Sequence, residues 1–271
     1  MAFFNYDKPG KGVEKDAPRA KGVFLYFDLL WRKLGRLLLV NILYFVTSLP
    51  VLFLYYILAY GFLGTVLPQG TADIARNQAA VIAVLVIASL WGTGPVSCGL
   101  CYILRNIARE EHTFLVSDFF EQCKKGFFHA LVFLAVDFAM LIVGTIAFTF
   151  YWSLASGGGV LEIALMATVV AIFVLYTAMH FYLYEVEVTF TGKLLSVYKN
   201  SFALAAATLP MCLLLGAIVI FVSFGFLGNV SPLGIVFFAL IFWMSVIRFI
   251  PEFYTARYIK RKLIPDESDA I

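Results

Sequence analysis

The sequence predicts an all-α fold, a polytopic transmembrane helical bundle of six spans with both chain ends in the cytosol (N-in/C-in). Residues of the AVILMFWYC set make up 62% of the 271 residues, and charged residues make up only 14%. The mean hydropathy is +0.91, whereas soluble domains are roughly half apolar and a quarter charged. The third observation is the uneven distribution of lysine and arginine along the chain, which predicts the orientation.

Six apolar stretches are long enough to cross a bilayer, which takes about 20 residues in a helix. Asp137 is the one acidic or basic residue deep inside any of them. We expect one integral membrane domain over residues 1–271, with a cytosolic arm at 1–22 and a cytosolic tail at 251–271. The spans are predicted at about 37–62, 79–100, 127–152, 161–184, 202–226 and 233–247.

The basic residues alternate sharply between the connecting segments. Of the 20 lysines and arginines, all except Arg76 fall in the arm and the short helix after it, the second-to-third connection, the fourth-to-fifth connection, or the end of the last span and the tail. Segments rich in lysine and arginine stay in the cytosol. The sequence therefore predicts a multi-pass protein of the cytoplasmic membrane, with the lipid bilayer as its partner. Nucleic-acid binding is not expected, because the basic residues follow the topology and form no single patch.

Short segments that mix aromatic, apolar and basic residues precede the first, third and fifth spans, at 27–41, 118–133 and 192–207. This composition is typical of amphipathic helices that lie at a membrane surface. We therefore expect short cytosolic interfacial helices and three hairpins, each made of one such helix and two spans. A weak internal repeat is one interpretation. The other is that every entry from the cytosol needs apolar and basic residues together.

Gly92, Gly94 and Pro95 interrupt the second predicted span. Pro95 cannot donate a hydrogen bond to the carbonyl of Trp91, and its ring crowds that carbonyl, so a kink or a short unwound turn is expected. One interpretation is a packing kink whose glycines allow close helix approach. The alternative is a lined cavity, as at the broken helices of transporters. These three residues are candidates for an intramembrane polar or kink site.

Asp137 is the strongest single candidate for a functional side chain. An ionised carboxylate near the middle of a membrane is costly, so such residues are usually protonated, paired or exposed to an aqueous path. The sequence leaves open a neutral, hydrogen-bonded side chain, proton coupling and contact with a polar substrate. Glu162, His180 and Glu185 are expected at the ends of the fourth span as interface residues, and Asn41 is expected to hydrogen-bond between helices.

Basic residues at the predicted cytosolic surface are candidate contacts for lipid headgroups or protein partners: Arg105, Arg109, Lys124 and Lys125. They lie in the second-to-third connection, beside the span ends.

Enzyme chemistry is not predicted. The sequence contains no Walker loop, no GxSxG and no HExxH motif. Cys98 and Cys101 form a CxxC, but we interpret them as small residues on a helix face in a reducing compartment rather than as metal or redox ligands. We predict no catalytic residue, no metal and no cofactor.

Two stretches resemble the YesL-like family of bacterial integral membrane proteins, a domain of unknown function. They are FFNYDKPGKGVEKDAP at 3–18 and GPVSCGLCYILRNIAREEHTFLVSDFFEQCKKGF at 94–127, within a resemblance that covers nearly the whole chain. The resemblance implies a role beside sugar-uptake transporters, in oligosaccharide import, and it implies no site residues.

We accordingly expect a membrane protein that is accessory to, or part of, carbohydrate uptake, with sugar-transporter subunits as partners. A stand-alone secondary transporter and a regulatory scaffold that binds lipids or protein partners are the alternatives.

Overall fold

The computed structural model describes residues 22–67, 72–155, 159–190 and 192–263, and these residues form helices without any strand. Most of the predicted arm, residues 1–21, lies outside the described residues, as do residues 264–271 of the predicted tail. The helices are, in chain order, α1 (Val23–Arg32), α2 (Leu34–Val66), α3 (Asp73–Leu90), α4 (Pro95–Arg109), α5 (Leu115–Lys125), α6 (Phe127–Ala155), α7 (Val160–Thr189), α8 (Leu194–Ala207), α9 (Leu209–Leu227), α10 (Pro232–Phe238), the π-helical turn η1 (Ala239–Trp243) and α11 (Met244–Leu263).

Six segments of the described chain are long and apolar enough to cross a membrane: Leu34–Thr65, Asp73–Leu90, Phe127–Leu154, Val160–Thr189, Leu209–Leu227 and Leu233–Leu263. The all-helical class and the number of candidate spans agree with the sequence prediction. Large apolar side chains stand exposed on their outer faces, including Phe53, Val143 and Phe221, which are 63%, 64% and 79% exposed. So much exposed apolar surface is what a protein surrounded by lipid presents. The predicted orientation, with both chain ends in the cytosol, stays a prediction.

The three short helices expected before the first, third and fifth spans are present as α1, α5 and α8. Each leads directly into a long helix, α2, α6 or α9. Their location at a membrane surface, on the cytosolic side, stays a prediction.

Two of the predicted boundaries that differ from the observed helices have a clear physical reason. The fifth predicted span begins at residue 202, but the long helix begins at Leu209, because Pro210 has no N–H for the preceding helix and instead opens a new one. The last predicted span ends at 247 and the predicted tail starts at 251, whereas α11 continues to Leu263. It continues because one face of this helix, including Phe249 and Ile259, is fully buried against the protein.

The predicted second span is not one helix. It is divided into α3, which ends at Leu90, and α4, which begins at Pro95. Gly92 and Gly94 have φ angles of 91° and 74°, in the left-handed region that glycine enters without a steric cost. The chain therefore turns at the predicted interruption and continues as a separate, largely buried helix.

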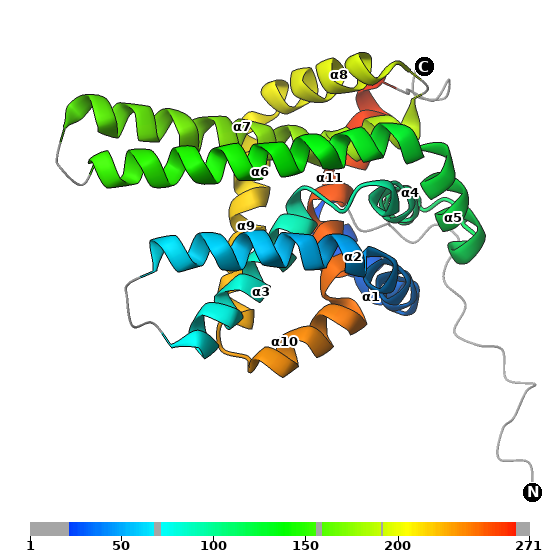
Figure 1. Cartoon of the computed structure of the whole chain (residues 1–271). Helices are drawn as coiled ribbons and strands as arrows, with labels where there is room; N and C mark the ends of the chain where they lie inside the picture. The colour runs from blue at the N-terminus through cyan, green and yellow to red at the C-terminus, as the bar shows by residue number, and fades with distance from the viewer. Residues whose placement is uncertain (1–21, 68–71, 156–158, 191, 264–271) are drawn as a thin grey trace, which may run out of the picture.

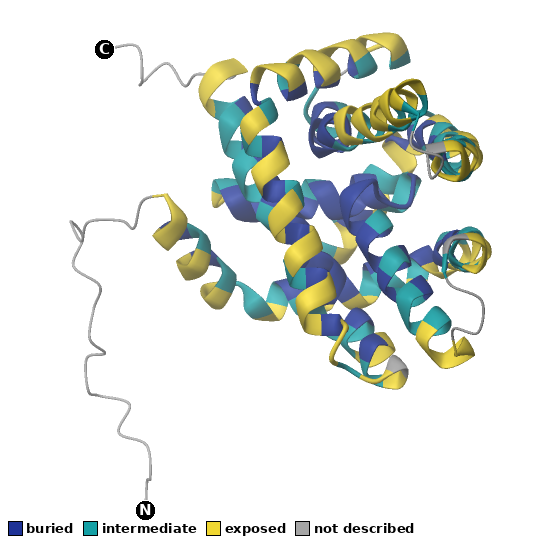
Figure 2. Ribbon diagram, turned by 90° about the vertical axis from the view of Figure 1, so that its left-hand side faces the viewer, coloured by how far each residue is buried: buried dark blue, intermediate teal, exposed yellow. Residues whose placement is uncertain are grey.

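The buried residues gather where the helices cross, and the outer faces of the long helices are exposed (Figure 2). The α6–α7 hairpin and the α2–α3 hairpin leave this crossing region as two arms, while α9 runs across the direction of α6 and α7 (Figure 1). Both arms extend from the same side of the core (Figure 1).

An unusual turn in the last span is held by the first span. The side-chain nitrogen of Asn41 donates to the carbonyls of Ala239 and Leu240, both at 2.8 Å, and its oxygen accepts from the N–H of Ser245 at 2.8 Å. These backbone groups flank or belong to the π-helical turn η1, where the regular hydrogen-bond pattern is interrupted. The predicted hydrogen bonding of Asn41 between helices is confirmed.

Candidate functional site

The interruption between α3 and α4 is surrounded by polar side chains of other helices. The hydroxyl of Tyr55 on α2 donates to the carbonyl of Gly92 at 3.1 Å. The N–H of Thr93 donates to the hydroxyl of Ser97 at 2.6 Å, and the N–H of Gly94 donates to the hydroxyl of Tyr184 on α7 at 3.2 Å. Each of these backbone groups, freed by the missing helical turn, thus has a partner in the protein, as irregular backbone at membrane depth requires.

Arg248 occupies the end of α3. Its guanidinium donates to the carbonyls of Ser89 and Leu90, at 3.1 and 3.4 Å, and its side chain is buried. A cation at a helix C-terminus is stabilised both by the free carbonyls and by the helix dipole. From the sequence, Arg248 belonged to the basic cytosolic end of the last span. The structure instead places it in the core, where it joins α11 to the break.

Asp137 on α6 is fully buried and has two neighbours on α7. The hydroxyl of Tyr176 donates to its Oδ1 at 2.7 Å, and Nε2 of His180 lies 2.8 Å from the same oxygen. The ring is not oriented for a hydrogen bond, however, and both ring nitrogens of His180 and Oδ2 of Asp137 have no hydrogen-bond partner among the described residues. A carboxyl and an imidazole therefore meet in the interior with hydrogen-bonding capacity left over.

The pairing corrects the expected position of His180, which is fully buried rather than at an interface. The predicted end of the fourth span at 184 placed His180 four residues from a span end, whereas α7 continues to Thr189. Asp137 lies ten residues after the start of α6 at Phe127, and His180 lies nine residues before the end of α7 at Thr189. In an antiparallel hairpin these positions have nearly the same depth, about 15 Å from the shared end. Hydropathy alone does not show this, because both residues stand in apolar surroundings.

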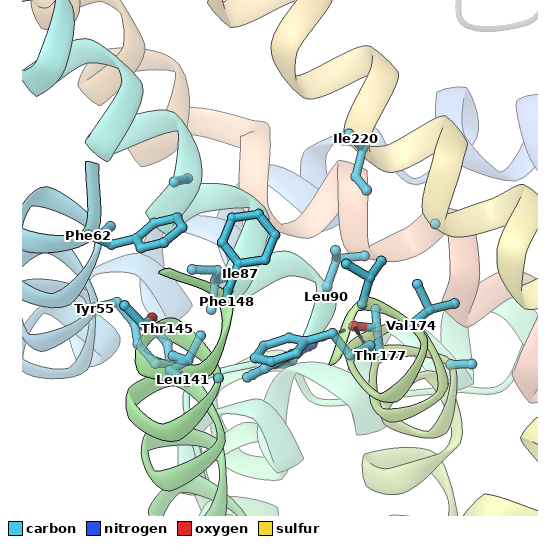
Figure 3. A pocket seen from close by; sticks show the side chains of 18 of the residues that line it. Tyr55, Phe62, Ile87, Leu90, Leu141, Thr145, Phe148, Val174, Thr177 and Ile220 are labelled. Carbon is cyan, nitrogen blue, oxygen red and sulfur yellow. Dashed lines mark hydrogen bonds between the residues drawn. The ribbon is translucent and has the colours of Figure 1, made fainter. Parts of the chain in front are cut away.

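A large apolar pocket lies beside the break. Its volume is about 740 Å³, and it is lined by residues of α2, α3, α6, α7 and α9. Figure 3 shows Phe62 and Tyr55 of α2, Phe148 of α6 and Ile220 of α9 around it. The pocket therefore lies between the α2–α3 hairpin, the α6–α7 hairpin and α9, all of which are long and apolar enough to span a membrane.

Trp91, the last residue before the glycines, connects the pocket with the buried pair. It lines the pocket, and its indole N–H donates to the hydroxyl of Thr177 at 2.9 Å. The indole also stacks on the ring of His180, with centroids 5.7 Å apart and planes 17° apart. Asp137 is not one of the described lining residues. The break thus has features of both the packing kink and the lined cavity. Side chains of other helices form hydrogen bonds with its backbone, and Trp91 forms part of the cavity wall.

Arg105 and Arg109 face the protein interior. Arg105 donates to the carbonyl of Val188 at 2.8 Å, and Arg109 pairs with the fully buried Glu185 at 2.6 Å. Glu185, expected as an interface residue near the end of the fourth span, lies four residues before the end of α7 at Thr189 and is fully buried within the protein. These two guanidinium groups do not have the exposed positions that a headgroup contact requires. Of the four predicted contacts, Lys124 and Lys125 are on the surface.

A compact cluster joins α4, α7 and α11. The thiol of Cys101 donates to Glu252 at 2.9 Å and lies 3.6 Å from Glu185, and potential ligand atoms of these three residues lie within 4.8 Å of one another. Arg109 and Arg248 accompany the two carboxylates, which balances the charge without an added cation. Burial, followed by the nearby Glu252 carboxylate, raises the pKa of the Cys101 thiol well above its ordinary value. We interpret the cluster as a structural polar network.

No protein-family model, curated protein or solved structure matches this chain. The resemblance to the YesL-like family stays a prediction, and the functional argument rests on the geometry of the site.

Proposed function

We propose that this protein is a multi-pass membrane protein that binds the acyl chain of a lipid in the apolar pocket between its two helical hairpins, α2–α3 and α6–α7. The observation that carries the proposal is the 740 Å³ apolar pocket formed by five helices. Its volume is typical of a ligand site, which usually measures about 300–1,000 Å³. This proposal corresponds to one of the alternatives derived from the sequence, a regulatory scaffold that binds lipids.

The chemistry of the lining favours a hydrocarbon over a sugar. The polar side chains are few, and the hydroxyl of Thr177 and the indole N–H of Trp91 are already bonded to each other. An oligosaccharide presents many hydroxyl groups, and each would lose its hydrogen bonds to water on entering this pocket. An acyl chain loses none, and it is the most abundant apolar molecule around a membrane-spanning helix.

The proposal is tested with lipids that carry bromine at the middle of the acyl chain, because bromine quenches tryptophan fluorescence on contact. In a variant with Trp91 as the sole tryptophan, such lipids should quench the emission although Trp91 is only 4% exposed. Gly216→Leu should reduce the quenching, because Gly216 lines the pocket and a side chain there points toward its wall at Phe181.

Gly225→Leu on the same helix is the matched control, since nothing lies within 4 Å of a Cβ at that position and Gly225 does not line the pocket. If quenching in the Gly216→Leu variant equals that in the Gly225→Leu variant, the lipid does not enter the pocket and the proposal fails.

A role in carbohydrate uptake follows from the resemblance to the YesL-like family, and we keep it as a second proposal. In this role the protein would be accessory to a transporter, with a sugar-transporter subunit as its partner. Deleting the gene should slow growth on oligosaccharides but not on glucose. Equal growth of the deletion strain on both carbon sources would remove this proposal.

Proton-coupled transport is a third candidate, supported by the unpartnered atoms of the Asp137–His180 pair. Proteoliposomes that contain a pH-sensitive dye should show proton entry under an imposed potential, and Asp137→Asn should abolish it. Glu162→Gln, at the opposite end of α7 from Thr189, serves as the control. Proton entry that persists in Asp137→Asn would exclude a proton path through this pair.

A further inference from the structure

A second pocket, of about 480 Å³, lies at the start of α5 and shares no lining residue with the apolar pocket. It is lined by Arg36 near the start of α2 and by the continuous segment 112–117, which contains the loop after α4 and the first turn of α5. Nothing in the acyl-chain proposal uses these residues.

The first turn of α5 presents free backbone donors to this pocket. The first regular backbone bond runs from the N–H of Asp118 to the carbonyl of Phe114, at 2.9 Å. The N–H groups of the three preceding residues, Leu115–Ser117, therefore have no acceptor within the helix. The residue before the helix is Phe114, whose side chain cannot accept a hydrogen bond. The helix has 11 residues, so its dipole adds positive potential at this end.

Thr113 provides an independent indication of a ligand. Its side chain is 5% exposed, and its hydroxyl has no hydrogen-bond partner among the described residues. Buried hydroxyl groups in native proteins almost always have a partner, because leaving one unpaired costs stability. Thr113 lines the pocket, so an acceptor bound there would complete its hydrogen bonding.

Arg36 supplies the charge. Its guanidinium forms no ion pair or hydrogen bond within the part of the chain that the structure describes, although nearby Arg32 is paired with Glu110 at 2.5 Å. The opposing charge at the pocket is Asp118, whose carboxylate already accepts the N–H of Phe114 at 2.9 Å. Glu111 is turned toward Lys260, at 3.4 Å. The guanidinium of Arg36, the hydroxyl of Thr113 and the first N–H groups of α5 therefore remain as donors at this pocket.

We infer that this pocket binds a phosphate group, through the guanidinium of Arg36, the hydroxyl of Thr113 and the N–H groups of the first turn of α5. A phosphate offers several acceptor oxygens to this set of donors, and the start of a helix is a common phosphate site. The phosphate can belong to a lipid headgroup or be free in solution. Apolar side chains beside the pocket, Phe114 and Val116, are 68% and 54% exposed, which suits a headgroup whose acyl chains lie next to them.

The test measures binding of two probes, inorganic phosphate and dihexanoyl phosphatidic acid, to the full-length protein in detergent by calorimetry. Arg36→Gln and Thr113→Val should each weaken binding by roughly 10- to 100-fold, as expected when a hydrogen bond to a charged group is lost. Lys33→Gln is the matched control, because it removes the same charge from a residue outside the lining.

The two probes distinguish the source of the phosphate. If the lipid binds and inorganic phosphate does not, the site recognises a headgroup. Comparable binding of both probes means that the phosphate alone is recognised. The unfolding temperature shows whether Thr113→Val remains folded, and removing the unpaired hydroxyl should not lower it. The inference is overturned if neither probe binds the wild-type protein, or if Arg36→Gln and Thr113→Val bind as tightly as Lys33→Gln.

Discussion

Replacing Gly92 by alanine is expected to destabilise the protein at the break between α3 and α4. The φ angle of Gly92 is 91°, a conformation that residues with a Cβ rarely adopt. A Cβ at this position would lie 2.6 Å from Oγ of Ser97 and 2.9 Å from Cε2 of Tyr184. Both side chains hold the break, since Ser97 accepts the N–H of Thr93 and Tyr184 accepts the N–H of Gly94.

The magnitude has two parts. The left-handed backbone costs on the order of 1–2 kcal/mol for a residue with a Cβ. Displacing Ser97 leaves the buried N–H of Thr93 without an acceptor, at about 1–3 kcal/mol. The free energy of unfolding should therefore fall by about 2–5 kcal/mol, and the unfolding temperature by roughly 5–15 °C for a chain of this size.

The assay is thermal unfolding in a mild detergent, followed by size-exclusion chromatography of the remaining folded protein. Gly225→Ala is the control, because this glycine is in a long helix, has no positive φ and has nothing within 4 Å of the place that a Cβ would take. An unfolding temperature of Gly92→Ala equal to that of Gly225→Ala would refute the account of how the break is held.

Three further changes test other parts of the fold. Asn41→Leu should lower the unfolding temperature by several degrees, because it leaves backbone groups at the π-helical turn unpaired at about 1–3 kcal/mol each; an unchanged value would contradict this role. Arg109→Met should lower the free energy of unfolding by about 3–5 kcal/mol, because the buried carboxylate of Glu185 loses its ion-pair partner. Adding Glu185→Gln removes the unpaired charge and should recover part of this loss, as measured by thermal unfolding of both variants. Burial raises the pKa of Cys123 from 9.0 to about 11, so at pH 8 maleimide should label it roughly 100-fold more slowly than in the denatured chain. Because the folded state holds the thiol proton more tightly, the contribution of Cys123 to the free energy of unfolding is fully present below pH 9 and is lost as the pH rises from 9 to about 11. Labelling at equal rates in the folded and denatured states would contradict the burial of Cys123.

The break illustrates how far sequence reasoning extends. Pro95 and its neighbouring glycines predict an interruption, because the missing N–H and the freedom at positive φ are properties of single residues. The side chains that surround the interruption, Tyr184 and Arg248, could not be predicted. They come from helices about 90 and 160 residues later in the chain, and which face they present depends on how those helices are rotated.

The second pocket, at the start of α5, also combines features that the sequence predicts with features that only the tertiary structure shows. Phe114 at the start of α5, with no side chain that can cap the helix, is visible in the sequence. The proximity of Arg36, which is 77 residues before Thr113 in the chain, depends on the packing of α2 beside the loop after α4. The burial of Thr113 without a hydrogen-bond partner is likewise a tertiary fact.

By itself, the sequence determined the all-helical membrane class, six candidate spans, the short helices before three of them and the position of the break. These properties follow from hydropathy and backbone chemistry summed over neighbouring residues, so they do not depend on distant contacts. Only the tertiary structure decided that Asp137 meets His180, that Arg109 is buried against Glu185 and that an apolar pocket opens between the arms. Those outcomes depend on helix rotation and crossing direction, which arise from packing between residues far apart in the chain.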